Sequence, residues 1–173
     1  MDDRFLMVVL RLIHIVGGVI WVGAVVLMTM FVVPAMRGAG QAGGRVMQEL
    51  VQRRRLSFYM NIVGGLTMLS GLTMYGYLAA RTDGVWAGSR PGMVFGFGAL
   101  ATIVAAVLGG AIVGRAGKQL GALGERVQAS GSPPSAADAA QMEALQARMG
   151  RTSRIVAVLI LIAAASMAIA RYV

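Results

Sequence analysis

The chain has 173 residues, of which 57% are hydrophobic and only 13% are charged, whereas soluble domains carry about 25% charged residues. This composition excludes an ordinary soluble domain and indicates a single membrane domain over residues 1–173. The formal net charge of +9 does not indicate a nucleic-acid partner, because no soluble part remains to carry a basic binding surface. The absence of cysteine excludes disulfides, thiolate metal sites and a cysteine nucleophile.

The first apolar segment is long enough to span a bilayer. From Leu12 to Val33 no residue is charged when His14, the one histidine of the chain, is neutral. At roughly 1.5 Å per residue this stretch forms about 33 Å of helix, enough to cross a hydrocarbon core of about 30 Å. The pattern predicts a helix over residues 5–33 that ends at Pro34.

The N-terminal residues support a membrane anchor rather than a cleaved signal peptide. The chain starts Met1-Asp2-Asp3-Arg4 and so lacks the basic n-region of a signal peptide. Asp2 or Asp3 is expected to cap the first helix.

Three further apolar segments predict spans at about 56–80, 92–114 and 152–172. The last span is short alone and is expected to continue a helix that begins near Ser135. Glycines at residues 38–44 predict a loop after the first span, followed by a short helix that leads into the second. The expected fold is therefore an all-α bundle of four transmembrane helices.

The basic residues predict how this bundle is oriented. The 34–57 connection holds five arginines and the 114–154 connection holds six basic residues, together 11 of the 16 Lys and Arg. Because basic loops remain on the cytoplasmic side, both connections and their short helices should be cytoplasmic. Both termini and the 81–91 turn should then lie outside. We expect a multi-pass protein of the inner, cytoplasmic membrane with the lipid bilayer as its first partner.

None of the four predicted spans contains an aspartate or a glutamate. Proton-coupled carriers and cation channels usually need an intramembrane carboxylate, so both classes are disfavoured. A hydrolase lacks an acidic partner for the histidine within the spans. A zinc site lacks the three or four ligands that it needs. The 13 methionines are scattered without a tight cluster, which disfavours a copper site.

His14 is the residue with the most chemical potential. On a helix, Gly18 and Trp21 share its face, and Arg11 lies one turn nearer the N-terminus. Three roles remain open for the imidazole: axial ligation of haem, proton handling at a quinone-like ligand, and a neutral hydrogen bond. The bond would go to Ser70, to Thr73 or to a backbone carbonyl within the bundle.

Haem demands little of a sequence: an axial imidazole, an apolar slot and a cation near the propionates. Gly17 and Gly18 would let a porphyrin lie flat against the helix, and Arg11 would reach a propionate. Trp21 is either a packing residue or a wall of that slot. The second axial ligand stays open between Met74, Met93, Met167, a tyrosine, His14 of a neighbouring protomer, and none.

The segment Leu12–Gly23 with Phe31–Pro34 resembles the first helix of the CopD-like and HemJ-like integral membrane proteins, which share a histidine followed about seven residues later by Trp-x-Gly. Residues 57–77, with Gly-Gly-Leu and Ser-Gly-Leu, resemble their second helix. The resemblance implies a four-helix unit whose first-helix histidine, here His14, binds b-type haem. HemJ-like proteins are associated with protoporphyrinogen oxidation and CopD-like proteins with copper handling. This chain has neither the intramembrane lysine of the former nor additional histidines for copper.

The sequence thus leads to an expected function: a haem b protein, with His14 as the iron ligand, that transfers electrons. A homodimer or a subunit of a membrane complex is expected, because the chain has no second histidine and its helices carry glycine-lined faces. The redox partner, which includes a possible quinone, stays open. The alternatives are a cofactor-free membrane scaffold or accessory subunit, and a HemJ-like protoporphyrinogen oxidase.

Overall fold

The computed structural model describes residues 3–173, and this part of the chain is helical without strands. Four helical stretches are long and apolar enough to cross a membrane: Asp3–Gly38, Leu56–Ala80, Arg90–Ala129 and Ala136–Tyr172. The prediction of an all-α fold with four such helices is confirmed. Of the two expected caps, Asp3 is the first residue of the first helix, and Asp2 lies outside the described residues.

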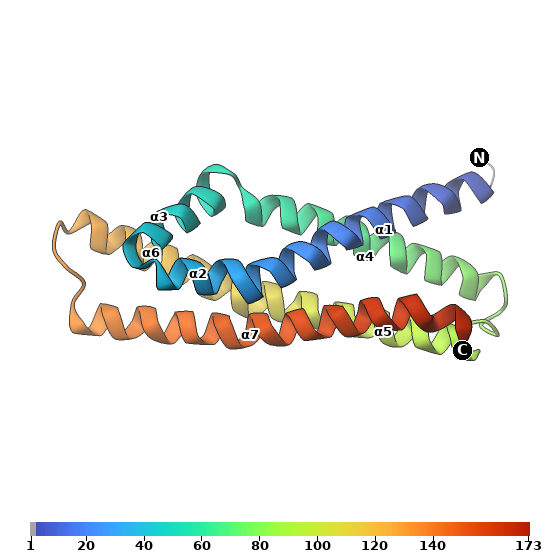
Figure 1. The fold of residues 1–173 in the computed structure, drawn as a ribbon. Helices are drawn as coiled ribbons and strands as arrows, with labels where there is room; N and C mark the ends of the chain where they lie inside the picture. The colour runs from blue at the N-terminus through green and yellow to red at the C-terminus, as the bar shows by residue number, and fades with distance from the viewer. Residues whose placement is uncertain (1–2) are drawn as a thin grey trace.

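The helices fold back and forth along one axis (Figure 1). Asp3 and Val173 lie at one end, which we call the terminal end; the α2–α3 and α6–α7 turns lie at the other, which we call the basic end. The elements are α1 (Asp3–Leu27), η1 (Met28–Val32), α2 (Val33–Gly38), α3 (Gly40–Gln48), η2 (Glu49–Arg53), α4 (Leu56–Ala80), α5 (Arg90–Leu108), η3 (Gly109–Gly114), α6 (Arg115–Ala129), α7 (Ala136–Ile169) and η4 (Ala170–Tyr172).

Two antiparallel helix pairs build the bundle: α1 packs mainly along α4, and α5 along α7. A buried cluster of Ala105, Val156 and Ile160 joins the α5–α7 pair to α1, whose Trp21 and Val25 pack against it. Small residues let α5 and α7 approach closely. Ala105 of α5, for example, has no exposed surface. Elsewhere the pairs turn apolar side chains outward, as expected of a protein solvated by lipid.

The first span does not end at Pro34, contrary to the prediction. The helix passes through Pro34 into α2 and ends at Gly38. The π-helical turn η1 ends at Val32, two residues before Pro34. Within a regular α-helix, proline lacks the N–H for the backbone hydrogen bond and its ring clashes with the carbonyl four residues earlier. A π turn alters the backbone hydrogen-bond pattern before the proline, so the helix can continue through it.

The prediction of a loop at residues 38–44 is also wrong, because most of this stretch is helical. Only a tight turn at Ala39 and Gly40, whose φ is +58°, separates α2 from the helix α3. Gly43 faces α2 so closely that a Cβ there would lie 1.8 Å from the carbonyl oxygen of Met36. These glycines therefore serve a close helix–helix turn rather than a flexible loop.

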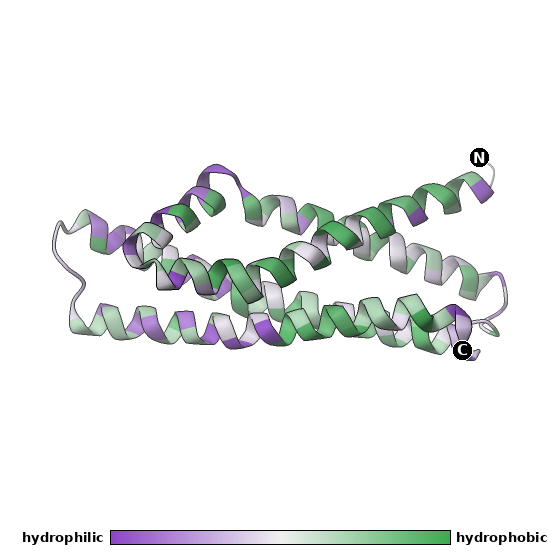
Figure 2. Ribbon diagram, in the orientation of Figure 1, coloured by the Kyte–Doolittle hydropathy of each residue, from purple (hydrophilic) through white to green (hydrophobic). Residues whose placement is uncertain are grey.

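The fourth span is the second half of a single long helix. α7 begins directly after Ser135, whose Oγ accepts a hydrogen bond from the Asp138 N–H at 3.1 Å. Its 34 residues are more than a bilayer core of about 30 Å requires, so one half extends beyond the apolar region. Figure 2 shows apolar ribbon toward the terminal end and polar segments in α3, α6 and the first half of α7.

The buried cluster yields a test of the fold. We expect Ile160→Ala to lower the free energy of unfolding by about 2–5 kcal/mol, because it opens a cavity where the side chain is only 1% exposed. Unfolding in mixed micelles with increasing denaturing detergent measures the change. The matched control is Ile162→Ala, which removes the same atoms from a side chain that is 39% exposed. Equal losses for the two variants would contradict this packing.

Candidate functional site

The contact between α1 and α4 pairs each large side chain with a small one. The His14 ring lies against Gly71, where an added Cβ would be 2.6 Å from the ring Cε1. Trp21 lies against Gly64, where a Cβ would be 2.9 Å from the indole Cε2. At the third position the small residue is on α1: a Cβ on Gly17 would be 2.5 Å from the hydroxyl of Thr67 on α4. We call these six residues the α1–α4 seam.

His14 makes one hydrogen bond across this seam. Its Nδ1 lies 2.7 Å from the backbone carbonyl oxygen of Thr67. Because a carbonyl can only accept, Nδ1 must carry the proton, and the neutral ring keeps its lone pair on Nε2. Of the hydrogen-bond partners considered from the sequence, the backbone carbonyl is the one found. Ser70 and Thr73 instead donate to carbonyls of their own helix.

The second ring nitrogen of His14, Nε2, has no hydrogen-bond partner among residues 3–173. In the same part of the chain, no side-chain nitrogen or oxygen is both buried and without a partner. Nε2 is therefore accessible from outside the chain, within an otherwise apolar helix. A polar atom without a partner is costly in hydrocarbon, so this nitrogen is a natural attachment point for a ligand.

The remaining predicted site residues of α1 divide between the flank of the seam and its interior. Arg11 is exposed and has no ion pair or side-chain hydrogen bond with any described residue. Gly18 is half-buried, and a Cβ there would make only an ordinary 3.7 Å contact with Thr67. The Thr67 hydroxyl occupies the space beside Gly17, and Trp21 packs against the buried cluster. The structure thus leaves Arg11 and Gly18 open beside His14 and closes Gly17.

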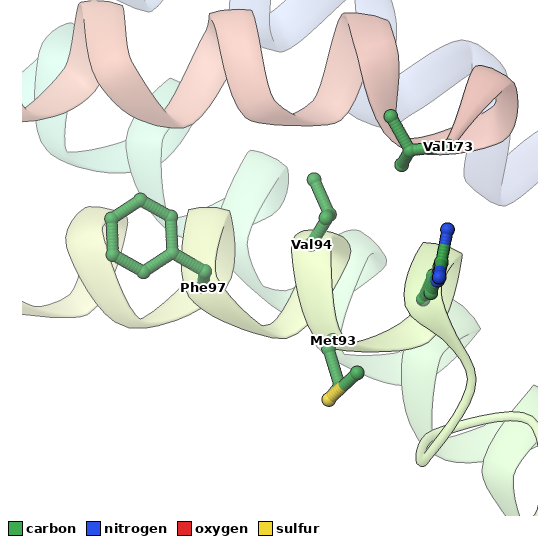
Figure 3. Close-up of a pocket in the computed structure, with 5 residues that line it drawn as sticks. Met93, Val94, Phe97 and Val173 are labelled. Atoms are coloured by element: carbon green, nitrogen blue, oxygen red, sulfur yellow. The ribbon is translucent and has the colours of Figure 1, made fainter.

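The methionines considered as second ligands on other helices belong to the α5–α7 pair. Met167 lies against Gly98, where a Cβ would be 3.4 Å from the methionine Cγ. Met93 lines a shallow groove of about 320 Å³ at the terminal end with Val94, Phe97 and Val173 (Figure 3). His14 instead lies in the α1–α4 seam, and Met74, on α4 itself, is half-buried.

The tyrosines near the terminal end are engaged with other residues. Tyr77 donates a 2.9 Å hydrogen bond to Asp3 and accepts a 2.6 Å bond from Arg81, which ties the start of α1 to the end of α4. Tyr75 packs edge-on against Trp86, with ring centroids 5.2 Å apart. Its hydroxyl would lie 3.1 Å from a Cβ on Gly96. These contacts fix the terminal end of α4 and hence the position of the seam.

The partners of His14 were not identified from the sequence. The signal for them is the spacing of Gly64, Thr67 and Gly71, which follows the same i, i+3, i+7 pattern as positions 14, 17 and 21 of α1. Two such stripes on antiparallel helices place a large residue opposite a small one at each step. In a chain with 24 glycines this match is easily overlooked.

Side chains that commonly ligate metals are dispersed in the described part of the chain. Across residues 3–173 no three His, Cys, Asp or Glu side chains come together. One imidazole can hold iron firmly where a porphyrin supplies the equatorial nitrogens. His14 supplies one imidazole of this kind.

Comparisons of the chain with protein-family models, with curated proteins and with solved structures find no match. No relative therefore contributes a ligand or a residue role here. The functional argument depends on the geometry of the α1–α4 seam.

The seam itself is testable with a pair of glycine variants. Gly71→Ala should lower the free energy of unfolding by about 1–3 kcal/mol, because the new methyl group collides with the His14 ring and separates the helices. Gly76→Ala on the same helix is the control, since nothing lies within 4 Å of its Cβ position. Its effect should stay within about 1 kcal/mol and be stabilising if anything. Detergent-induced unfolding measures both, and a harmless Gly71→Ala would contradict the seam.

Proposed function

We propose that this protein binds haem b through Nε2 of His14 and acts as a membrane electron carrier. The observation that carries the proposal is the 2.7 Å hydrogen bond from Nδ1 of His14 to the Thr67 carbonyl. Metal-ligating histidines commonly donate their other ring N–H to a carbonyl or a carboxylate, which fixes the tautomer and the ring orientation. Here the same bond leaves an accessible lone pair on Nε2.

The surroundings of His14 suit an amphiphilic cofactor. Haem, when bound, supplies an iron centre that takes up and releases one electron. The chain contributes the apolar surface of α1, with the half-buried Gly18 one turn from His14 toward the basic end. Arg11, one turn in the other direction, is exposed and is suited to bind a propionate. Since no carboxylate lies in the apolar part of the spans, electron transfer is favoured over proton-coupled transport.

A second copy of the chain is the simplest source of a second axial ligand. His14 is the only histidine of the chain, and its Nε2 is not fully buried and has no hydrogen-bond partner among the described residues. A homodimer or a complex with another membrane subunit would therefore provide a second ligand from outside the chain. The redox partner, a quinone included, is not specified by these residues.

The proposed location is the cytoplasmic membrane, with the basic end inside. The polar and basic half of the bundle gathers at that end, which includes 11 of the 16 Lys and Arg (Figure 2). Positive residues next to spans favour the cytoplasmic side. The connecting helices α2, α3 and α6 would then be cytoplasmic, and both termini would lie outside.

A cofactor-free scaffold is the second candidate, and one observation favours it. His14 already joins two helices through its bond to Thr67, and the Thr67 hydroxyl fills the space at Gly17. In this case the histidine would serve helix packing alone. Nε2 would then be satisfied by lipid headgroups, by water or by a partner protein.

Haem binding predicts a specific absorption spectrum. Protein purified in detergent and supplied with haemin should show a Soret band and, after reduction with dithionite, sharp α and β bands. His14→Gly should lose these bands, and added imidazole should restore them, because free imidazole replaces the missing ligand. Rescue by imidazole separates loss of the ligand from loss of the fold, because a misfolded variant would not recover the bands.

Two outcomes would contradict the haem proposal. The first is a wild-type protein that stays colourless with haemin. The second is a spectrum that the His14→Gly substitution leaves unchanged. In the first case the scaffold candidate takes precedence, and in the second another residue is the ligand.

The orientation can be tested directly, because the chain contains no cysteine. Ser132→Cys at the α6–α7 turn should react with a membrane-impermeant maleimide only after the cells are opened. Val85→Cys at the α4–α5 turn should react in intact cells, since Val85 is 77% exposed. Gel-shift labelling reads both, with the cysteine-free protein as the background. The reverse pattern would contradict the proposed orientation.

A further inference from the structure

We propose that the outward face of α7 binds an anionic phospholipid, with Arg151 and Arg154 holding the phosphate. Arg148, Arg151 and Arg154 follow one another at intervals of three residues and are all exposed. The same side of the helix continues toward the terminal end with the exposed side chains of Ile155, Val158 and Leu161. This inference is independent of haem and rests on the bundle alone.

The sides of α7 are fixed by its packing. Thr152, Val156, Ile160 and Ala163 are buried at helical spacing, so they mark the side that faces the other helices. Arg151 and Arg154 lie away from that side, as do Val158 and Leu161, which are 50% and 44% exposed. The outward stripe therefore changes from guanidinium to aliphatic within one helical turn. A phospholipid changes from phosphate to acyl chain over a similar distance.

The acidic residues of the basic end, Glu49, Glu125, Asp138 and Glu143, form no ion pair with these arginines. Glu49 pairs with Arg53 and Arg54, and Asp138 pairs with Arg126. Arg151 and Arg154 make no ion pair or side-chain hydrogen bond with any residue of the described chain. Their charge is thus available to an external anion at the boundary of the apolar region.

A third cation lies at the same height on the neighbouring helix. Gly117 of α6 packs against Met149 of α7, with 3.7 Å between the Cβ position of the glycine and the methionine Cε. Because α6 and α7 run antiparallel, this contact brings Arg115, at the start of α6, level with Arg151. Arg115 is exposed and also has no partner among the described residues. Met149 lies on the same inward side of α7 as Thr152 and Val156, so Arg115 adds positive charge at this level of the bundle but is not part of the outward stripe.

The expected preference follows from the charge of the headgroup. Each basic residue near a membrane surface strengthens binding to an anionic lipid about fivefold. A zwitterionic headgroup gains little, and a free phosphate lacks the acyl chains that contact the aliphatic part of the stripe. The site should therefore select anionic phospholipid over phosphatidylcholine and over inorganic phosphate.

Electron spin resonance of reconstituted protein tests the proposal. Spin-labelled phosphatidylglycerol should associate with the wild-type protein at least fivefold more strongly than spin-labelled phosphatidylcholine. Arg151→Gln with Arg154→Gln should remove most of this preference, whereas the Lys,Lys variant should keep it because the charge remains. Arg45→Gln with Arg55→Gln, which removes two exposed arginines that form no ion pair with the described residues and lie away from the stripe, should change the preference less than twofold. Circular dichroism confirms that each variant is helical.

Three results would overturn the proposal. The wild-type protein could show equal association of the two lipids. The Arg151,Arg154 variant could keep the full preference. Inorganic phosphate, added at constant ionic strength, could abolish the preference, which would make the cluster an anion site without a role for the acyl chains.

Discussion

The hydrogen bond between Nδ1 of His14 and the Thr67 carbonyl is the interaction on which the account depends. No residue of α1 is buried in the fold, so few contacts other than the α1–α4 seam hold this helix in place. Gly71 permits the bond, because any larger residue there would meet the imidazole ring. One contact therefore links the position of the first helix to the protonation of the one histidine.

The two ends of the bundle differ in polarity. Toward the terminal end the helices are apolar and lipid-exposed, and their contacts rely on small residues such as Gly64, Gly71 and Gly98. Toward the basic end the same helices continue into a polar part, where ion pairs such as Arg126 with Asp138 tie α6 to α7. Continuous helices thus connect the membrane region to a polar extension without a separate domain.

The sequence was sufficient for the number and type of spans, because hydropathy over some 20 residues reflects the thickness of the bilayer. The sequence was insufficient where a contact between helices overrode a local sequence preference. Pro34 predicted a helix end, yet the π turn η1 accommodates it. The glycines at residues 38–44 predicted a loop, but the close approach of α3 to Met36 needs Gly43 and the turn before it uses the positive φ of Gly40.

The candidate site was also only partly accessible from the sequence. His14, Arg11 and Gly18 could be placed together by helical spacing within one segment. The role of Gly17 could not, because it depends on Thr67, which is 50 residues further along the chain. Contacts between helices require the register between them, and apolar patterns specify which side of a helix is buried but not its neighbour.

The tautomer of His14 tests the central claim most directly, since the chain has one histidine and ¹⁵N-histidine labelling therefore yields one pair of ring-nitrogen signals. Solid-state NMR of the haem-free protein in lipid should show a protonated Nδ1 and an unprotonated Nε2. Haemin should then shift or broaden the Nε2 signal far more than that of Nδ1. A proton on Nε2 in the haem-free protein would contradict the bond to Thr67 and, with it, the proposed ligand.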